Sequence, residues 1–105
     1  MGERTANVQA GNIGQTIESL AQTLHGRWDA DPEQSYTARL LQGKEDKLLS
    51  KIAEEASEVI MACKDNDHDH IRYEAGDLVY HLLVVLERYG VTVDELAGEL
   101  NARMR

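Results

Sequence analysis

A chain of 105 residues with four Tyr, one Trp and no Phe must build its core mainly from Leu, Val, Ile and Ala, and its length fits a single domain. Its formal net charge is −8, and no basic run is present to neutralise a phosphate backbone, which argues against nucleic-acid binding. The charge does not exclude a phosphate-rich small molecule as the substrate, provided that divalent cations first bind to the acidic residues that would otherwise repel it.

The sequence also indicates the cellular compartment in which the protein is expected. Cys63 is the single cysteine and cannot form an intramolecular disulfide, which fits a reducing environment. No run of 18 apolar residues is present to span a membrane, and the N-terminus lacks the pattern of a signal peptide. We therefore expect a cytoplasmic protein with no membrane partner. The apolar neighbours Val59 and Ile60 predict that the thiol lies in the core.

Residues 1–11 are polar and without periodicity, so we expect a mobile tail before one helical domain of residues 12–105. A first helix is predicted up to Gly26 by apolar residues at helical spacing: Ile13, Ile17, Leu20 and Leu24. A second is predicted to start at Asp31-Pro32-Glu33, because Asp caps helices and Pro is tolerated in the first turn. It ends at Gly43, and Tyr36 within it is interpreted as a packing residue.

Two long helices follow, at 44–64 and 70–89, joined by a polar turn. The first carries the apolar stripe Leu48, Leu49, Ile52, Ala56, Val59, Ile60 and Cys63. The second carries Ile71, Ala75, Leu78, Leu82, Val85, Leu86 and Tyr89. We expect an antiparallel αα-hairpin, then a short last helix capped by Thr92 or Asp94. The predicted fold is all-α, with four to five helices around this hairpin.

Two acid pairs stand out on the long helices. Glu55 and Glu58 lie three residues apart on the first, and Glu74 and Asp77 repeat this spacing on the second. Residues three apart share one helix face, and a hairpin can turn two such faces toward each other. A single pair is typical of a solvated surface. Glu55 and Glu74, however, flank the apolar stripes, where an unpaired carboxylate is costly, so the pattern predicts a four-carboxylate metal centre.

Oxygen ligands without Cys or His favour Mg²⁺ or Mn²⁺ over Zn²⁺. A di-iron bundle would need Glu-x-x-His, and none of the four histidines has a Glu three positions earlier. His81, four residues after Asp77, either orients that carboxylate, contacts substrate or is a hydrogen-bonded histidine at the core edge. Lys51 forms either a helix ion pair with Glu55 or a phosphate contact. His68 and His70 lie in the polar turn and are predicted to be exposed.

The chain resembles the phosphoribosyl-ATP pyrophosphatase family of histidine biosynthesis over residues 13–104. The motifs that carry the resemblance are Ser35-Tyr36-Thr37, Leu40-Leu41, Gly43-Lys44-Glu45-Asp46-Lys47, Lys51, Glu54-Glu55-x-x-Glu58-Val59 and Glu74-x-x-Asp77-Leu78-x-Tyr80-His81-Leu82. The acidic half is shared with the wider MazG-like, all-α nucleoside-triphosphate pyrophosphohydrolases. The stretch from Ser35 to Lys47 is what narrows the match to this family.

The resemblance implies an ATP-binding enzyme that hydrolyses phosphoribosyl-ATP to phosphoribosyl-AMP and pyrophosphate with Mg²⁺, for which Mn²⁺ can substitute. It implies a MazG-like fold completed as a homodimer or higher oligomer, and the form without a fused cyclohydrolase. By the same resemblance, the metal ligands are Glu55, Glu58, Glu74 and Asp77. Glu54 is a further catalytic acid and our candidate for positioning the attacking water, while Lys51 and His81 are the expected substrate-binding residues.

Two other hypotheses stay open at the level of sequence. A house-cleaning nucleoside triphosphate pyrophosphatase would use the same acids on other substrates, and only the stretch 35–47 argues against it. A non-catalytic helical interaction module would explain the amphipathic helices but not an acid such as Glu74 beside the core. Binding of a divalent cation separates the module from both enzymes, and the choice of substrate separates the enzymes from each other.

Overall fold

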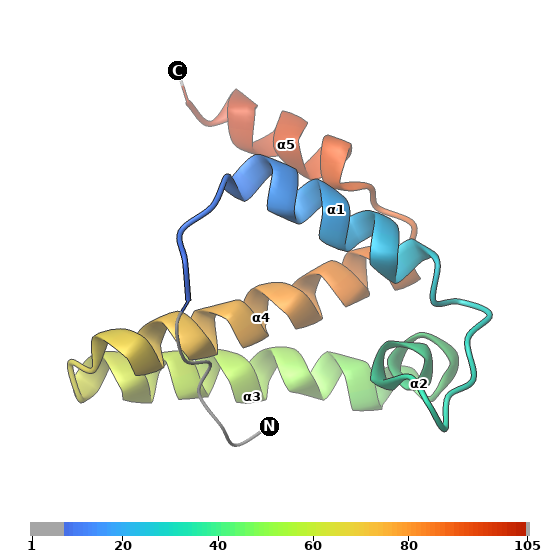
Figure 1. Ribbon diagram of the computed structural model, residues 1–105, viewed down its shortest axis with the longest axis horizontal. Coiled ribbons are helices and arrows are strands. Elements are labelled where there is room, and N and C mark those ends of the chain that lie inside the picture. The colour runs from blue at the N-terminus through green and yellow to red at the C-terminus, as the bar shows by residue number, and fades with distance from the viewer. Residues whose placement is uncertain (1–7, 105) are drawn as a thin grey trace.

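The computed structural model describes residues 8–104, and over this range it holds five α-helices and no strand. They are α1 (Ile13–His25), α2 (Tyr36–Gln42), α3 (Glu45–Lys64), α4 (His68–Arg88) and α5 (Val93–Ala102), arranged as in Figure 1. The all-α prediction is confirmed. Residues 1–7 of the predicted tail lie outside the described residues, and 8–12 are not helical. None of the described helices is long and apolar enough to cross a membrane.

The predicted hairpin of α3 and α4 forms the base of the molecule. The two helices lie side by side and make the most extensive contact between elements (Figure 1). The turn between them is short because Asn66 adopts a left-handed conformation, with φ of 54°, which Asn tolerates better than most residues. Asp67 then caps α4, and its side chain accepts a hydrogen bond from the backbone N–H of His70 at 3.2 Å.

The predicted start of the second helix is wrong by several residues, since α2 begins at Tyr36 and not at Asp31. The side chain of Asp31 accepts from the backbone N–H of Glu33 at 2.9 Å, and its carbonyl accepts from the N–H of Ser35 at 2.9 Å. Asp31 therefore closes a local turn instead of capping a helix. Ser35 takes the capping role, with its hydroxyl accepting from the N–H of Ala38 at 3.1 Å.

The core lies at the end of the hairpin where α1 and α2 pack against it. Its buried residues are Leu24, Leu40, Leu41, Leu48, Leu83 and Val84. The predicted stripe of α3 is partly wrong, because Cys63 is exposed, Ile60 is 61% exposed and Leu49 is 39% exposed. The buried residues of α3 are Leu48, Glu55 and Ala62, which recur every seven positions as in the seam between two packed helices. The seam of the hairpin therefore passes through Glu55.

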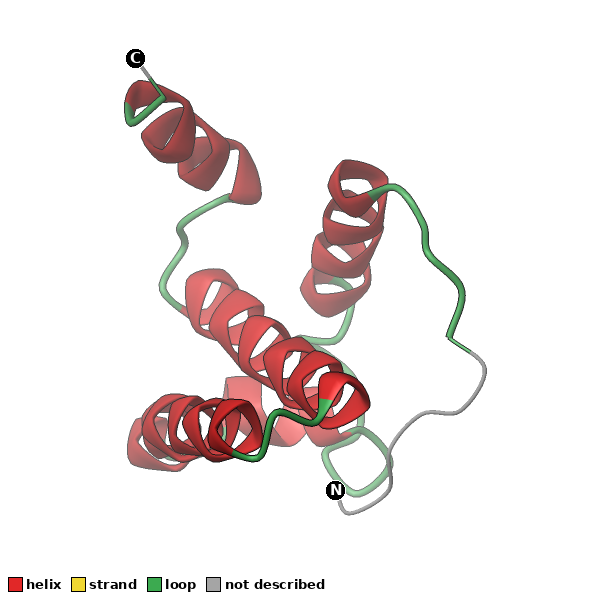
Figure 2. Cartoon of the chain, turned by 90° about the vertical axis from the view of Figure 1, so that its left-hand side faces the viewer, coloured by secondary structure: helices red, strands yellow, loops and turns green. Residues whose placement is uncertain are grey.

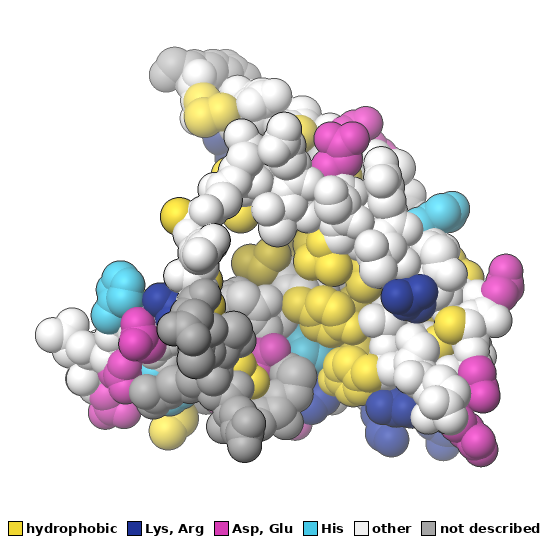
Figure 3. Space-filling view, in the orientation of Figure 1, with side chains coloured by type: hydrophobic (Ala, Val, Ile, Leu, Met, Phe, Trp, Pro, Cys, Tyr) yellow, Lys and Arg dark blue, Asp and Glu magenta, His cyan; other side chains and the backbone are white. Residues whose placement is uncertain are grey.

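α1 lies over α4 (Figure 1), and α5 approaches α1 but stands apart from it over most of its length in Figure 2. Figure 2 shows how little α5 approaches α3. The radius of gyration is 14.6 Å, larger than the roughly 13 Å expected of a compact domain of this length. Apolar side chains line the hollow between α1 and α4 in Figure 3. A cavity of about 410 Å³ lies between α1, α4 and α5 and is lined by Ile17, Leu82 and Leu96 among others.

Candidate metal centre

The hairpin brings the two predicted acid pairs together. Glu55 and Glu58 of α3 and Glu74 and Asp77 of α4 each place one carboxylate oxygen so that the four oxygens lie within 4.8 Å of one another. The spacing of three residues puts each pair on one helix face, and the antiparallel packing turns the two faces toward each other. Among residues 8–104, no His or Cys side chain belongs to this cluster. The set consists of oxygen ligands only, as Mg²⁺ and Mn²⁺ prefer.

Two of these acids are buried, with Glu55 only 5% and Glu74 only 6% exposed. Glu58 is exposed and Asp77 is partly exposed, so the cluster opens to solvent on one side. The Oε2 atom of Glu55 is buried and has no hydrogen-bond partner. A buried carboxylate oxygen without a donor is costly, and three neighbouring acids increase that cost. A divalent cation would satisfy this oxygen and offset the repulsion, so the residues present fit the cation that the sequence predicts.

The electrostatics of the cluster follow from this crowding. Burial, and then the negative charges of Asp77, Glu58 and Glu74, raise the pKa of Glu55 from 4.5 to about 7. Burial and a hydrogen bond with Glu58 also raise the pKa of Glu74, while His70 acts in the opposite direction. These directions are those of acids that hold protons when no cation is bound. A bound cation would compete with these protons.

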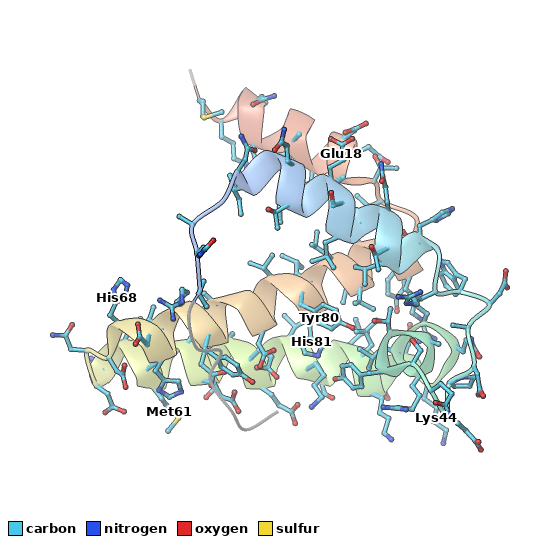
Figure 4. The ribbon with its side chains drawn as sticks, viewed as in Figure 1. Glu18, Lys44, Met61, His68, Tyr80 and His81 are labelled. Atoms are coloured by element: carbon cyan, nitrogen blue, oxygen red, sulfur yellow. The ribbon has the colours of Figure 1, made fainter. Side chains whose placement is uncertain are left out.

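His70 was predicted to be merely exposed, and this prediction is wrong. Its Nε2 atom lies 3.3 Å from Glu74 Oε2, and its side chain is only 28% exposed. The spacing of four residues between His70 and Glu74 was the signal in the sequence that could have found this contact. His68, by contrast, is exposed as predicted, and Figure 4 shows it pointing away from the hairpin.

Glu54 and Lys51 lie beside the cluster and not in it. The side chain of Glu54 is 58% exposed and lies 3.6 Å from the ammonium group of Lys51. Tyr36 and then Glu54 raise the pKa of Lys51. The structure thus does not bring Glu54 among the four converging carboxylates. Lys51 pairs with Glu54 on α3 and lies close enough to Tyr36 of α2 to feel its charge.

His81 is fully buried, at 0% exposure, with both ring nitrogens in hydrogen bonds. Its Nδ1 donates to the backbone carbonyl of Asp77 at 2.8 Å, which leaves Nε2 as the acceptor for the hydroxyl of Tyr36 at 2.9 Å. The rings of Tyr36 and Tyr80 each lie nearly perpendicular to the imidazole, and Thr37 forms a hydrogen bond with the Tyr80 hydroxyl. Figure 4 shows Tyr80 and His81 on α4 near α2. Tyr36 therefore ties α2 to the helix that bears Asp77, a role that its interpretation as a packing residue missed.

The fold and this site together define a class: an all-α protein whose central helical hairpin holds a four-carboxylate cluster suited to a divalent cation. The chain matches the family model described as phosphoribosyl-ATP pyrophosphohydrolase over residues 17–104. It is 49% identical over 87 residues to a phosphoribosyl-ATP pyrophosphatase of Nitrosomonas eutropha, covering 83% of this chain and 74% of the relative. It is 42% identical over 87 residues to the protein of the same name from Dechloromonas aromatica, covering 83% and 81% of the two chains.

A third relative is a histidine biosynthesis bifunctional protein of Nostoc, 40% identical over 92 residues, which are 88% of this chain and 43% of the relative. The chain belongs to the phosphoribosyl-ATP pyrophosphohydrolase family. This confirms the resemblance seen in the sequence and favours an enzyme over a non-catalytic helical interaction module.

Proposed function

We propose that this chain hydrolyses phosphoribosyl-ATP to phosphoribosyl-AMP and pyrophosphate in histidine biosynthesis, using a divalent cation, with Mg²⁺ expected and Mn²⁺ able to replace it. Its membership of the phosphoribosyl-ATP pyrophosphohydrolase family supports the assignment of this reaction. The observation that carries the metal is the convergence of four carboxylates around the unpartnered Oε2 atom of Glu55. A purely structural acid cluster gives no reason for that arrangement.

Glu55, Glu58, Glu74 and Asp77 would hold the cation, which would supply positive charge to phosphate oxygens that the acids alone would repel. Glu58 and Asp77 lie on the open side of the cluster, so this side admits the triphosphate. Glu54, outside the ligand set, is our candidate for orienting the attacking water. Lys51 is our candidate for a phosphate contact, because its ammonium group lies near this side of α3.

We assign His81 a positioning role. With 0% exposure and both ring nitrogens occupied, it supports the site through Asp77 and Tyr36 and does not itself face solvent. Its hydrogen bond to the Asp77 carbonyl lies within α4 and fixes the orientation of the imidazole next to that acid. Tyr36 holds the ring in the tautomer that this bond requires.

We further propose that the chain works as a homodimer or higher homo-oligomer. Several large apolar side chains of the hairpin are exposed, among them Ile60 at 61%, Met61 at 62% and Leu82 at 40%. A second copy of the chain would cover such exposed apolar side chains. Sedimentation equilibrium of the wild type and of Met61→Glu tests this proposal. A monomeric wild type at micromolar concentration would contradict it.

The experiment that tests the function is release of pyrophosphate from phosphoribosyl-ATP, compared with ATP and dUTP, first with Mg²⁺ and then with EDTA. Release from phosphoribosyl-ATP alone, abolished by EDTA and restored by Mg²⁺ or Mn²⁺, is the expected result. Release chiefly from ATP or dUTP would instead show a general nucleotide pyrophosphatase. Release that persists in EDTA would contradict the role of the cation.

A further inference from the structure

A cationic cavity opens at the end of the hairpin, where α2 ends and α3 begins. It measures about 620 Å³, against about 290 Å³ for the cavity beside Asp77. Arg39, Lys44 and Lys47 line it, although the chain as a whole carries a net charge of −8. Figure 4 shows Lys44 at this end of the molecule, and Lys and Arg side chains gather on the same end in Figure 3.

The side chains of this cavity are available to bind an anion. Within residues 8–104, neither Lys44 nor Lys47 forms an ion pair, whereas Lys51 pairs with Glu54. Arg39 donates one hydrogen bond to the carbonyl of Pro32 at 2.7 Å, and its guanidinium carbon lies 5.6 Å from the centroid of the Tyr36 ring. A guanidinium group has five N–H donors, so these two contacts fix its position and leave further donors for a ligand.

The cavity is aligned with the four-carboxylate centre. Lys47, Lys51 and Glu55 follow one another at intervals of four residues on α3, so they lie along one face of this helix. At a rise of 1.5 Å per residue, Lys47 lies about 12 Å from Glu55 along the helix axis. A ligand bound between the two regions would thus meet acids, and any cation that they hold, at one end and a group of basic side chains at the other.

We propose that this cavity binds the phosphate on the second ribose of phosphoribosyl-ATP, through Arg39, Lys44 and Lys47. This proposal rests on the function proposed above. The substrate carries a triphosphate and, on an additional ribose, a phosphate monoester. The four-carboxylate centre suits the triphosphate only when a cation is present, and it repels any other phosphate nearby. The basic cavity supplies the missing counter-charge, and because ATP and dUTP lack this phosphate, it selects for phosphoribosyl-ATP.

The test compares Lys47→Gln with Lys64→Gln. Lys64 lies in the last turn of the same helix, is also exposed, and is absent from the cavity, so both variants lose one positive charge from α3. For each variant we would measure kcat and KM for phosphoribosyl-ATP, and the inhibition constants of phosphoribosyl-AMP and AMP, which differ only by the phosphoribosyl group. Circular dichroism checks the fold, and Lys44→Gln replaces Lys47→Gln if the latter does not fold.

Lys47→Gln is expected to raise the KM and the inhibition constant of phosphoribosyl-AMP about tenfold, as for one lost charge-assisted hydrogen bond. It should leave kcat and the inhibition constant of AMP within about twofold, and Lys64→Gln should change none of these values by more than that. Equal effects on AMP and phosphoribosyl-AMP, or no effect on either, would overturn the cavity proposal while wild-type turnover stayed intact. Wild-type protein that releases no pyrophosphate would overturn the proposed function, and the cavity proposal with it.

Discussion

Two glutamates packed close to the core, Glu55 and Glu87, differ in what surrounds them. Glu87 Oε2 accepts hydrogen bonds from Trp28 Nε1 at 2.8 Å and from His25 Nδ1 at 2.9 Å, so α1 and its following loop supply its partners. Glu55 Oε2 has no partner, and its nearest charged neighbours are acids. Glu87 thus links α4 to α1 and the loop after it, whereas Glu55 has an oxygen that is free to bind a ligand. Burial alone does not distinguish a functional acid from a structural one. The presence or absence of hydrogen-bond donors around the carboxylate does.

The largest effect should come from Glu55→Gln, which removes a ligand charge and keeps the shape of the side chain. We expect turnover of phosphoribosyl-ATP to fall at least about a thousandfold, because cation-mediated charge stabilisation is lost. The metal-free variant should unfold at the same or a higher temperature than wild type, since one repelling charge is gone. Asp77→Asn should behave in the same way. Full activity in both variants would overturn the metal-site assignment.

Next in size is the dependence of metal-free stability on pH. The folded-state pKa of Glu55 is raised from 4.5 to about 7, so the folded protein binds a proton that the unfolded chain has lost. The stability from this proton is fully present below pH 4.5 and disappears as the pH rises through about 7, a loss of up to about 3 kcal/mol. Urea unfolding in EDTA, repeated at several pH values from about 5 to about 8, measures this loss.

Saturating Mg²⁺ should remove most of this pH dependence, because the cation stabilises the ionised cluster and binds the folded state more strongly as the acids lose protons. Glu55→Gln should reduce the dependence of stability on pH in EDTA, with no need for Mg²⁺. A wild-type protein that becomes more stable in EDTA as the pH rises across the same range would contradict the assigned pKa direction.

A smaller effect is expected at the partnered acid. Glu87→Gln weakens the hydrogen bonds from Trp28 and His25, and should lower the free energy of unfolding by about 1–2 kcal/mol. Turnover per folded molecule and affinity for Mn²⁺ should stay at wild-type values. Chemical denaturation and Mn²⁺ titration followed by electron paramagnetic resonance provide both measurements. A change in Mn²⁺ affinity would show that the two glutamates are less separate than their contacts indicate.

The smallest effect should come from Tyr36→Phe, which removes one neutral hydrogen bond to the buried His81. We expect a loss of about 1 kcal/mol in stability and a few-fold weaker Mn²⁺ affinity, because the support of the Asp77 region is loosened. Tyr89→Phe is the matched control. Tyr89 also donates a hydrogen bond to a side chain, that of Glu45, but Glu45 lies at the start of α3, away from the four-carboxylate centre. Equal changes in Mn²⁺ affinity for both variants would leave Tyr36 with no specific link to the site.

The sequence predicted the helical hairpin and its acid pairs because both depend on local spacing. Residues three apart share a helix face whatever the tertiary structure, so the grouping of Glu55 with Glu58 and of Glu74 with Asp77 was accessible. The start of α2 was not, because Asp31 and Ser35 both suit a cap and only the closed turn decides between them. The burial of Cys63 was wrong for a related reason: the seam runs through Leu48, Glu55 and Ala62, and a rule based on hydrophobicity excludes a glutamate.

The bond between His81 and Tyr36 joins residues that are 45 positions apart, and no periodic pattern reports such a contact. The cationic cavity likewise needs the end of α2 to meet the start of α3. Both features depend on how elements pack, which the spacing of side chains within one element does not encode.

The position of the four acids on either side of one short turn has a consequence for engineering. All four lie between residues 55 and 77, within a single pair of antiparallel helices. This ligand set is thus portable: the segment should transfer as one unit into an unrelated helical bundle whose two helices have the same register. In such a host, the ion would act as a removable cross-link between the helices, and a chelator would release it.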